Sequence, residues 1–219
     1  MNRAFERAFE NQLYELLDKL AQIPSLDIEL FDPEKTVLVM MDMTVGIIKN
    51  KAEFFEPFLG IIEPVRDLLI KFKSKGIKSI AFADMHTEKS VEFRCWPKHC
   101  ISGTDGAEII KELSDIGGFT KMGKNSLNAF HSPEFQTFLK EHDDIENYVV
   151  CGVSSDISVL NFCLTLKSYF DQSDKEVNVI IPYNAIETFS QRIHENDIAN
   201  VLALQHMASQ GIEIVKDIY

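Results

Sequence analysis

The chain has 219 residues, 45% of them hydrophobic, which is enough for one substantial core and short for two full domains. Its net charge of −12 disfavours binding to nucleic acid or to an anionic membrane surface, so a small molecule or another protein is the expected partner. A chain of this size does not need its four cysteines as disulfide staples, and no apolar run approaches the length of a membrane span, so we expect a cytoplasmic protein.

The first segment of the chain is expected to form an amphipathic helix over about residues 4–21. Apolar residues recur there at helical spacing while charged residues fill the opposite face, the apolar positions being Phe5, Phe9, Leu13, Leu16, Leu17 and Leu20. This stripe needs a partner, either the domain itself or a second subunit, and we expect a homo-oligomer. We therefore separate a helical lead-in, residues 1–35, from one folded domain, residues 36–219.

From residue 37 the pattern changes to short apolar runs that are typical of buried parallel strands joined by crossover helices. The six runs are 37–41, 77–83, 119–122, 148–151, 177–181 and 212–215. Helical patterns lie between them at about 60–75, 105–113, 133–141, 156–170 and 191–210. Ser132-Pro133 opens one helix, and Ser190 and Gly211 bound the last. This alternation predicts an α/β fold, a three-layer α/β/α sandwich with a six-stranded, mainly parallel, doubly wound sheet.

Candidate metal ligands follow the second predicted strand. In such a sheet the ligand crevice lies beyond the carboxyl ends of the strands. The strand ends in Asp84-Met85-His86, and the loop Trp96-Pro97-Lys98-His99-Cys100 comes next. One carboxylate and two imidazoles, those of Asp84, His86 and His99, could bind a divalent ion such as zinc, manganese or iron. The alternative is a solvated loop with a hydrogen-bonded histidine.

Candidate catalytic groups follow other strands. Asp42 comes directly after the first strand, where partial burial could raise its pKa and suit it to general base catalysis, or where it could simply end the strand. Lys124 lies after the third strand, and Lys121 competes with it for a role. The segment from Gly152 to Ser158 turns from a strand into a helix whose first N–H groups can stabilise an oxyanion, although ordinary helix capping would use the same segment.

These segments together resemble, in order and spacing, the isochorismatase-like cysteine hydrolases over roughly residues 35 to 190. The family's aspartate after the first strand matches Asp42, and its lysine shortly before an aromatic residue matches Lys124. Its nucleophilic cysteine belongs to a Gly-x-x-x-Asp-x-Cys-Val segment. Gly152 and Asp156 match that segment, and Ser158 occupies the place of the cysteine.

The nicotinamidase branch of this family is similar in its metal site, which uses Asp-x-His and the histidine of a Trp-Pro-x-His-Cys loop. The matching residues here are Asp84, His86 and His99. Glu92 resembles a further acid that some members bring to the metal. The resemblance also implies that the metal binds a pyridine nitrogen and that Trp96 forms a wall of the substrate pocket.

The resemblance implies hydrolysis of a linear carboxamide by a nucleophile at position 158. Asp42 would shuttle the proton, Lys124 would favour the anionic nucleophile, and backbone N–H groups near Ser154 and Ser158 would hold the oxyanion. Ser158 departs from the family because a hydroxyl needs a far stronger base than a thiol, whose pKa is about 8.5. Thr44 and Ile47 also depart, replacing a glutamine and an aromatic residue, and these changes bear on the substrate.

Three interpretations follow. The first is a metal-dependent nicotinamidase, converting nicotinamide to nicotinate and ammonia, with position 158 altered. The second is a related amidase that acts on another small amide. The third is a non-catalytic member of the family that binds a ligand or a partner.

Overall fold

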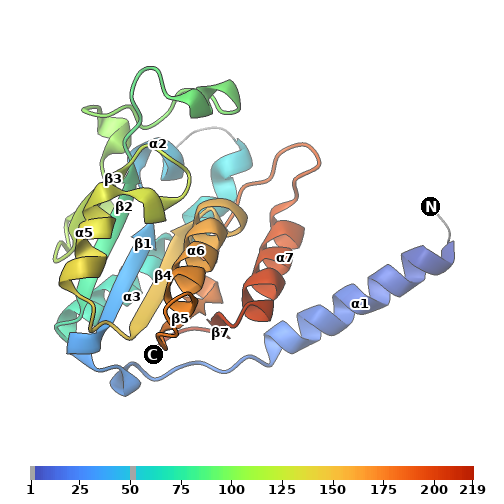
Figure 1. Cartoon of the computed structure of the whole chain (residues 1–219). Helices are drawn as coiled ribbons and strands as arrows, with labels where there is room; N and C mark the ends of the chain where they lie inside the picture. Colours follow the sequence, from blue (N-terminus) through green and yellow to red (C-terminus); the bar gives the residue numbers. More distant parts are fainter. Residues whose placement is uncertain (1–2, 50–52) are drawn as a thin grey trace.

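A parallel β-sheet forms the centre of the structure, a computed structural model that describes residues 3–49 and 53–219 (Figure 1). Its strand order is β3-β2-β1-β4-β5-β7, a short β6 pairs with β4, and every pairing between these strands is parallel. The strands are β1 (Thr36–Met41), β2 (Lys78–Asp84), β3 (Thr120–Lys124), β4 (Asn147–Val153), β5 (Asn178–Pro182), β6 (Ile186–Glu187) and β7 (Glu213–Val215). The strand order reverses between β1 and β4, which makes this pair the topological switch point where ligands bind in such sheets.

The predicted doubly wound α/β fold is confirmed, but the predicted number of strands is wrong. All six expected runs form strands, and the described residues form a seventh, β6. This strand has two residues, Ile186 and Glu187, that pair with Gly152 and Val153 of β4. Two residues are too few to show a strand period in the sequence.

Helices cover both faces of the sheet. Leu38 and Met40 of β1 point to the face covered by α3 (Ile62–Ser74), the short α4 (Lys111–Ser114) and the 3-10 segment η3 (Glu53–Ile61). Val37, Val39 and Met41 point to the face covered by α5 (Pro133–Glu141), α6 (Leu160–Asp171) and α7 (Asn196–Ser209). Successive strand residues alternate between the faces, so an uninterrupted apolar strand supplies both cores at once.

Two predicted helices differ from the observed ones. Residues 105–113 form a 3-10 turn, η5 (Asp105–Ala107), and then α4, in place of one helix. The last helix begins at Asn196 and not at Ser190, because the segment between them forms a turn in which the Ser190 hydroxyl accepts a hydrogen bond from the Asn196 amide at 3.0 Å. Its end was predicted correctly, since Gly211 has a φ of 81° just after it.

The amphipathic helix α1 (Arg3–Ala21) projects away from the domain (Figure 1). Leu13 and Leu16 line a shallow groove together with Ile198 and Leu202 of α7, while Leu17 is exposed. The side chains of Phe5 and Phe9, which belong to the predicted stripe, lie outside the described residues. The packing of this apolar stripe against a second subunit therefore stays a prediction. The division of the chain into a lead-in, residues 1–35, and a domain, residues 36–219, also stays a prediction.

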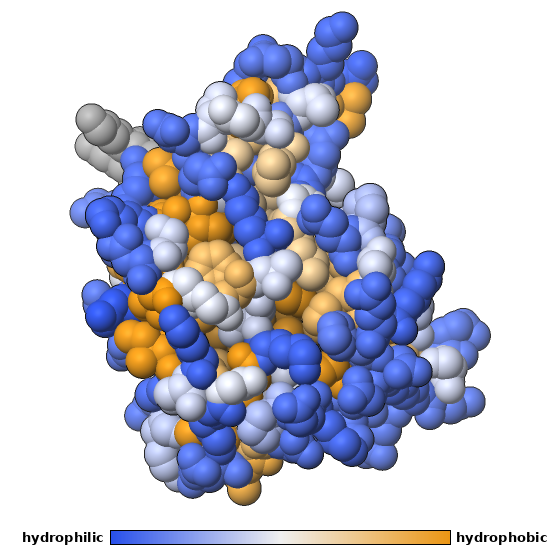
Figure 2. Space-filling view, turned by 90° about the vertical axis from the view of Figure 1, so that its left-hand side faces the viewer, coloured by the Kyte–Doolittle hydropathy of each residue, from blue (hydrophilic) through white to orange (hydrophobic). Residues whose placement is uncertain are grey.

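The face drawn in Figure 2 is mostly hydrophilic, with apolar side chains exposed between the polar and charged ones. This agrees with the net charge of −12. Among the described helices, none combines the length and the apolar composition that crossing a bilayer requires.

Candidate active site

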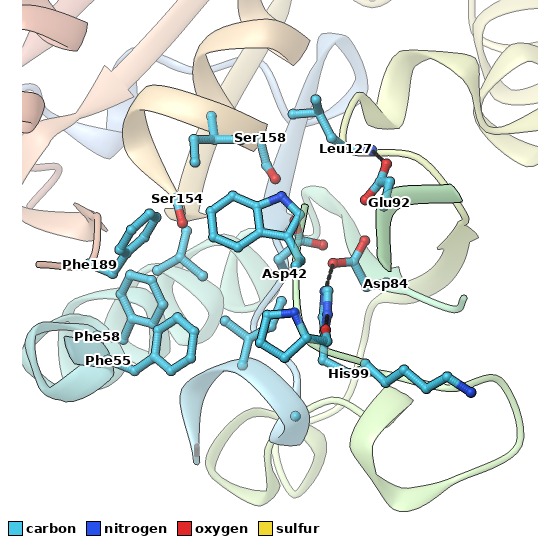
Figure 3. A pocket seen from close by; sticks show the side chains of 17 residues that line it. Asp42, Phe55, Phe58, Asp84, Glu92, His99, Leu127, Ser154, Ser158 and Phe189 are labelled. Atoms are coloured by element: carbon cyan, nitrogen blue, oxygen red, sulfur yellow. Dashed lines mark hydrogen bonds and ion pairs between the residues drawn. The ribbon is translucent and has the colours of Figure 1, made fainter. Parts of the chain in front are cut away.

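A small pocket of about 110 Å³ opens at the switch point between β1 and β4. Asp42 follows β1, Asp84 ends β2, and Ser154 and Ser158 follow β4, so three separate stretches of the predicted motifs meet in one place. In Figure 3 the rings of Phe55, Phe58 and Phe189 lie on one side of this pocket and Asp84, Glu92 and His99 on the other. The pocket is lined by residues 42, 46, 47, 55, 58, 84, 92, 96–99, 127, 153, 154, 157, 158 and 189.

A buried lysine joins two buried carboxylates at the base of the pocket. Lys124 Nζ lies 2.9 Å from Oδ2 of Asp42 and forms a second ion pair with Oδ1 of Asp84. All three side chains are at least nine-tenths buried. The second oxygen of Asp42, Oδ1, has no hydrogen-bond partner within the described part of the chain. Asp42 therefore has a carboxylate oxygen still available for a proton.

This arrangement gives the three groups different proton affinities. Burial and then the charge of Asp84 raise the pKa of Asp42 to about 7, although Lys124 and the Ser158 hydroxyl act in the opposite direction. Burial raises the pKa of Asp84 too, but Lys124 and the two imidazoles outweigh it and hold that pKa well below its usual range. Burial lowers the pKa of Lys124, and the two carboxylates more than reverse this, so Lys124 is an ammonium ion.

The structure places Lys124, and not Lys121, beside Asp42. Lys121 lies three residues before Lys124 on β3, is partly exposed and forms an ion pair with Glu108 at 2.8 Å. Two residues that differ by three positions on a strand point to opposite faces, which is why only one of them can reach the pocket. The catalytic role of Lys124 remains a prediction.

The predicted metal ligands converge. The candidate ligand atoms of Asp84, His86 and His99 all lie within 4.8 Å of one another. Oδ2 of Asp84 is 3.5 Å from Nε2 of His86 and 3.4 Å from Nε2 of His99. His86 is fully buried, yet its Nε2 has no hydrogen-bond partner among the residues that the structure describes. A buried polar atom without a partner is costly unless another group binds it.

The hydrogen bonds behind the two imidazoles favour metal binding. Nδ1 of His86 donates to Oδ1 of Asn125 at 3.2 Å, and Nδ1 of His99 donates to the carbonyl of Pro97 at 2.9 Å. With the proton on Nδ1, each ring directs the Nε2 lone pair toward Asp84. Donation from the second ring nitrogen to an oxygen is the usual arrangement behind a metal-binding histidine, so these residues fit a divalent ion.

Glu92 is close to this cluster but is already partly engaged. Its Oε1 accepts a hydrogen bond from the Leu127 amide at 2.7 Å (Figure 3). Its Oε2 lies 3.8 Å from Nε2 of His86. One carboxylate oxygen of Glu92 thus anchors the loop after β3, and the other faces the candidate ligands.

Ser158 lies on a turn whose shape depends on a glycine. The turn is a single π-helical segment, η7 (Ser155–Val159), placed between β4 and α6. Gly152, just before it, has a φ of 108°, and a Cβ atom there would come within 2.1 Å of the Met41 carbonyl oxygen. A close approach of β4 to β1 therefore requires glycine at 152 and brings Ser158 over Asp42.

The aromatic wall was not anticipated from the sequence, apart from Trp96. Phe55 stacks on Phe58 at 5.4 Å between ring centroids, and Phe189 meets Phe55 at 6.2 Å. Trp96 contacts Phe189 edge to face at 5.6 Å. Phe55 and Phe58 belong to η3, and Phe189 follows β6, which are the elements that no periodic pattern revealed. Ile47, noted as a departure from the family, also lines the pocket.

None of the four cysteines replaces the missing thiol at this site. Cys151 and Cys163 are buried in the core, and burial raises the pKa of both thiols. Burial also raises the pKa of Cys100 to about 12, and its sulfur contacts the Thr44 hydroxyl at 3.3 Å. Cys95 is exposed and does not line the pocket.

The comparisons with known proteins agree with this geometry. A family model described as an isochorismatase domain matches residues 36–210. No curated protein matches the chain. The solved structures that are similar to it include two nicotinamidase or pyrazinamidase structures and an N-carbamoylsarcosine amidase. Nicotinamidase PncA from Bacillus subtilis has 23% sequence identity and a TM-score of 0.70, and the match covers 83% of this chain and 99% of that one.

A pyrazinamidase from Pyrococcus horikoshii in complex with zinc has 24% identity and a TM-score of 0.65, over 83% of this chain and 99% of that one. N-carbamoylsarcosine amidase from Thermoplasma acidophilum has 21% identity and a TM-score of 0.68, over 83% and 96%. At these identities the likeness shows a shared fold.

Proposed function

Because this chain belongs to the isochorismatase family of hydrolases, we propose that it is a metal-containing amidohydrolase of the nicotinamidase type in which Ser158 restricts turnover. One observation carries the proposal: a candidate metal triad and a buried Asp42–Lys124 pair meet in a single small aromatic pocket beside Ser158. The apolar rings suit a flat ring, and the polar groups at the other side suit a carboxamide.

A divalent ion held by Asp84, His86 and His99 would supply a positively charged anchor for a lone pair of the ligand. The nicotinamidase from Bacillus subtilis and the zinc complex of the Pyrococcus horikoshii pyrazinamidase support this choice of ligand and ion. Phe55, Phe58 and Phe189 would hold the ring of the ligand. The carboxamide would then extend toward Asp42 and Ser158.

The chain's own residues account for the proton transfers. As the nucleophile at position 158 forms its bond to the carbonyl carbon, its proton passes to Asp42, and the carbonyl π electrons move onto the oxygen. When the C–N bond breaks, Asp42 returns the proton to nitrogen and ammonia leaves. Water then cleaves the acyl–enzyme bond and yields the acid. A base with a pKa of about 7 suits a thiol far better than a hydroxyl.

Ser158 also supports a second candidate, a non-catalytic member that binds the same ligand. The pocket, the aromatic wall and the candidate metal ligands would all serve binding without turnover. A related amidase with a different small substrate would use the same groups, and N-carbamoylsarcosine amidase is one structural neighbour of that kind.

The test is the substitution Ser158→Cys, assayed for ammonia release from nicotinamide after loading the protein with zinc, manganese or iron. We expect near-background turnover by the unchanged protein and an increase of at least about 100-fold in the variant. Ser155→Cys is the matched control, because Ser155 belongs to the same turn but bonds to Asn200 and does not line the pocket.

The outcomes separate the candidates. A folded Ser158→Cys protein that binds metal and nicotinamide but hydrolyses none would contradict the amidase and favour the binding protein. Binding of metal without binding of nicotinamide would favour another substrate. Absence of metal from the protein after all three reconstitutions would contradict the nicotinamidase assignment.

A further inference from the structure

His194 lies behind the aromatic wall and contacts both Phe189 and the η7 turn. Its ring stacks on Phe189, with 4.3 Å between centroids and 14° between planes. Its Nδ1 is 2.8 Å from the Phe189 carbonyl oxygen, and its Nε2 is 2.7 Å from Oδ2 of Asp156. Asp156 belongs to η7, the turn that carries Ser158. The His194 side chain thus connects Phe189 of the aromatic wall to the turn that carries Ser158.

The chemistry of the two partners sets the protonation of the ring. A carbonyl oxygen and an ionised carboxylate only accept hydrogen bonds, so both ring nitrogens of His194 must donate. The ring is therefore an imidazolium, and both bonds are charge-assisted. Burial lowers the pKa of His194, but the hydrogen bond and the charge of Asp156 outweigh it and the net shift is upward.

Asp156 is also bonded to the segment that carries Phe189. Its Oδ1 accepts a hydrogen bond from the Thr188 hydroxyl at 2.6 Å, and Thr188 is the residue before Phe189. Within the described residues, Asp156 is the charged group in contact with the His194 ring, because Phe189 is neutral and Gln191 meets only the His194 backbone. The His194 backbone is held by two hydrogen bonds to Gln191, and its ring is held by the contacts with the Phe189 carbonyl and Asp156.

Phe189 connects the other aromatic residues of the pocket wall. Phe189 is only 6% exposed, and it contacts Trp96 and Phe55 as well as the ligand cavity. We propose that His194 is a positioning residue: as an imidazolium held between Asp156 and Phe189, it fixes the aromatic wall relative to the η7 turn and thereby sets the affinity of the pocket for an aromatic ligand. The inference rests on the proposed function only for the choice of nicotinamide as the probe.

Two substitutions separate the functions of the ring. His194→Phe keeps a ring to stack on Phe189 but removes both donors, and His194→Gln keeps a donor toward Asp156 but removes the charge and the ring. Ile193→Ala is the matched control, since this neighbouring side chain is fully exposed. Asp156→Asn removes the negative charge that the His194 ring contacts and keeps the shape of the side chain.

Three measurements are made on the zinc-loaded full chain. They are the Kd for nicotinamide by calorimetry, the emission maximum of Trp96, which is the single tryptophan of the chain, and the ¹⁵N shifts of the His194 ring at pH 7. We expect both ring nitrogens to be protonated in the unchanged protein. We expect His194→Phe to weaken nicotinamide binding by about tenfold or more and to shift Trp96 emission, His194→Gln to fall in between, and Ile193→Ala to change neither.

A neutral His194 ring at pH 7, or a folded His194→Phe protein with unchanged Kd and Trp96 emission, would overturn the inference. If His194→Phe fails to fold, Asp156→Asn and His194→Gln give the same test. If the unchanged protein does not bind nicotinamide, the proposed function fails, and Trp96 emission and the ring shifts still decide the role of His194.

Discussion

Nζ of Lys124 lies 2.9 Å from Oδ2 of Asp42, and neither side chain is more than 2% exposed. The same ammonium also pairs with Asp84, so one buried cation compensates two buried anions. Removing one partner from such a group leaves uncompensated charge in a medium that solvates it poorly. This relationship links the stability of the domain to the residues predicted to carry its chemistry.

Lys124→Met should therefore destabilise the protein by about 3–5 kcal/mol, because Asp42 and Asp84 lose their shared counterion. Urea unfolding measures the change. Lys121→Met, which removes only a partly exposed pair with Glu108, should cost less than about 1 kcal/mol. Equal effects of the two substitutions would contradict the structure around Asp42.

Gly152→Ala should be among the most damaging small substitutions. The new Cβ would lie 2.1 Å from the Met41 carbonyl oxygen, and the φ of 108° is unfavourable for alanine. We expect a loss of at least about 3 kcal/mol in the free energy of unfolding. Gly60→Ala is the control, because nothing lies within 4 Å of a Cβ there, and it should change stability little.

Zinc should raise the thermal stability of the protein through His86 and His99. At a free concentration 100 times its Kd, an ion that binds only the folded state stabilises it by about 2.7 kcal/mol. His99→Ala should abolish the increase in Tm and the bound zinc measured by elemental analysis. His131→Ala, at an exposed histidine outside the triad, should preserve both. A zinc-dependent Tm in the His99→Ala protein would place the ion elsewhere.

The contribution of His194 to stability should depend on pH. Burial lowers the pKa of this ring and Asp156 raises it, with a net upward shift, so the folded protein binds the proton more tightly than the unfolded chain. The stabilisation is then fully present below the unfolded pKa of about 6.5 and is lost as pH rises through the folded pKa. The difference in unfolding free energy between the unchanged protein and His194→Phe should shrink from pH 5.5 to pH 8.5. A difference that stays constant or grows with pH would show that the ring is not held as an imidazolium.

Much of the fold follows from local pattern. Runs such as 37–41 and 148–151 are apolar at every position, which fits strands buried on both faces, and they were predicted as strands of the sheet on this ground. The order of these runs, with polar residues directly after them, also indicated which side chains would meet. The carboxyl ends of parallel strands share one edge, so this order placed Asp42, Asp84, both lysines of the third strand and the segment with Ser158 among the candidates. The family resemblance then selected Lys124 and Ser158 from them.

Other features depend on contacts between distant segments. The two-residue β6 forms only because β4 offers an edge for it, and it carries Phe189 into the pocket beside Phe55 from η3. The bond between His194 and Asp156 joins two turns that are separate in sequence. Short elements and long-range side-chain contacts leave no periodic trace in a sequence, because burial of their side chains is provided by other parts of the chain. Likewise, the direction in which each side chain points from β3 decides that Lys124, and not Lys121, contacts Asp42.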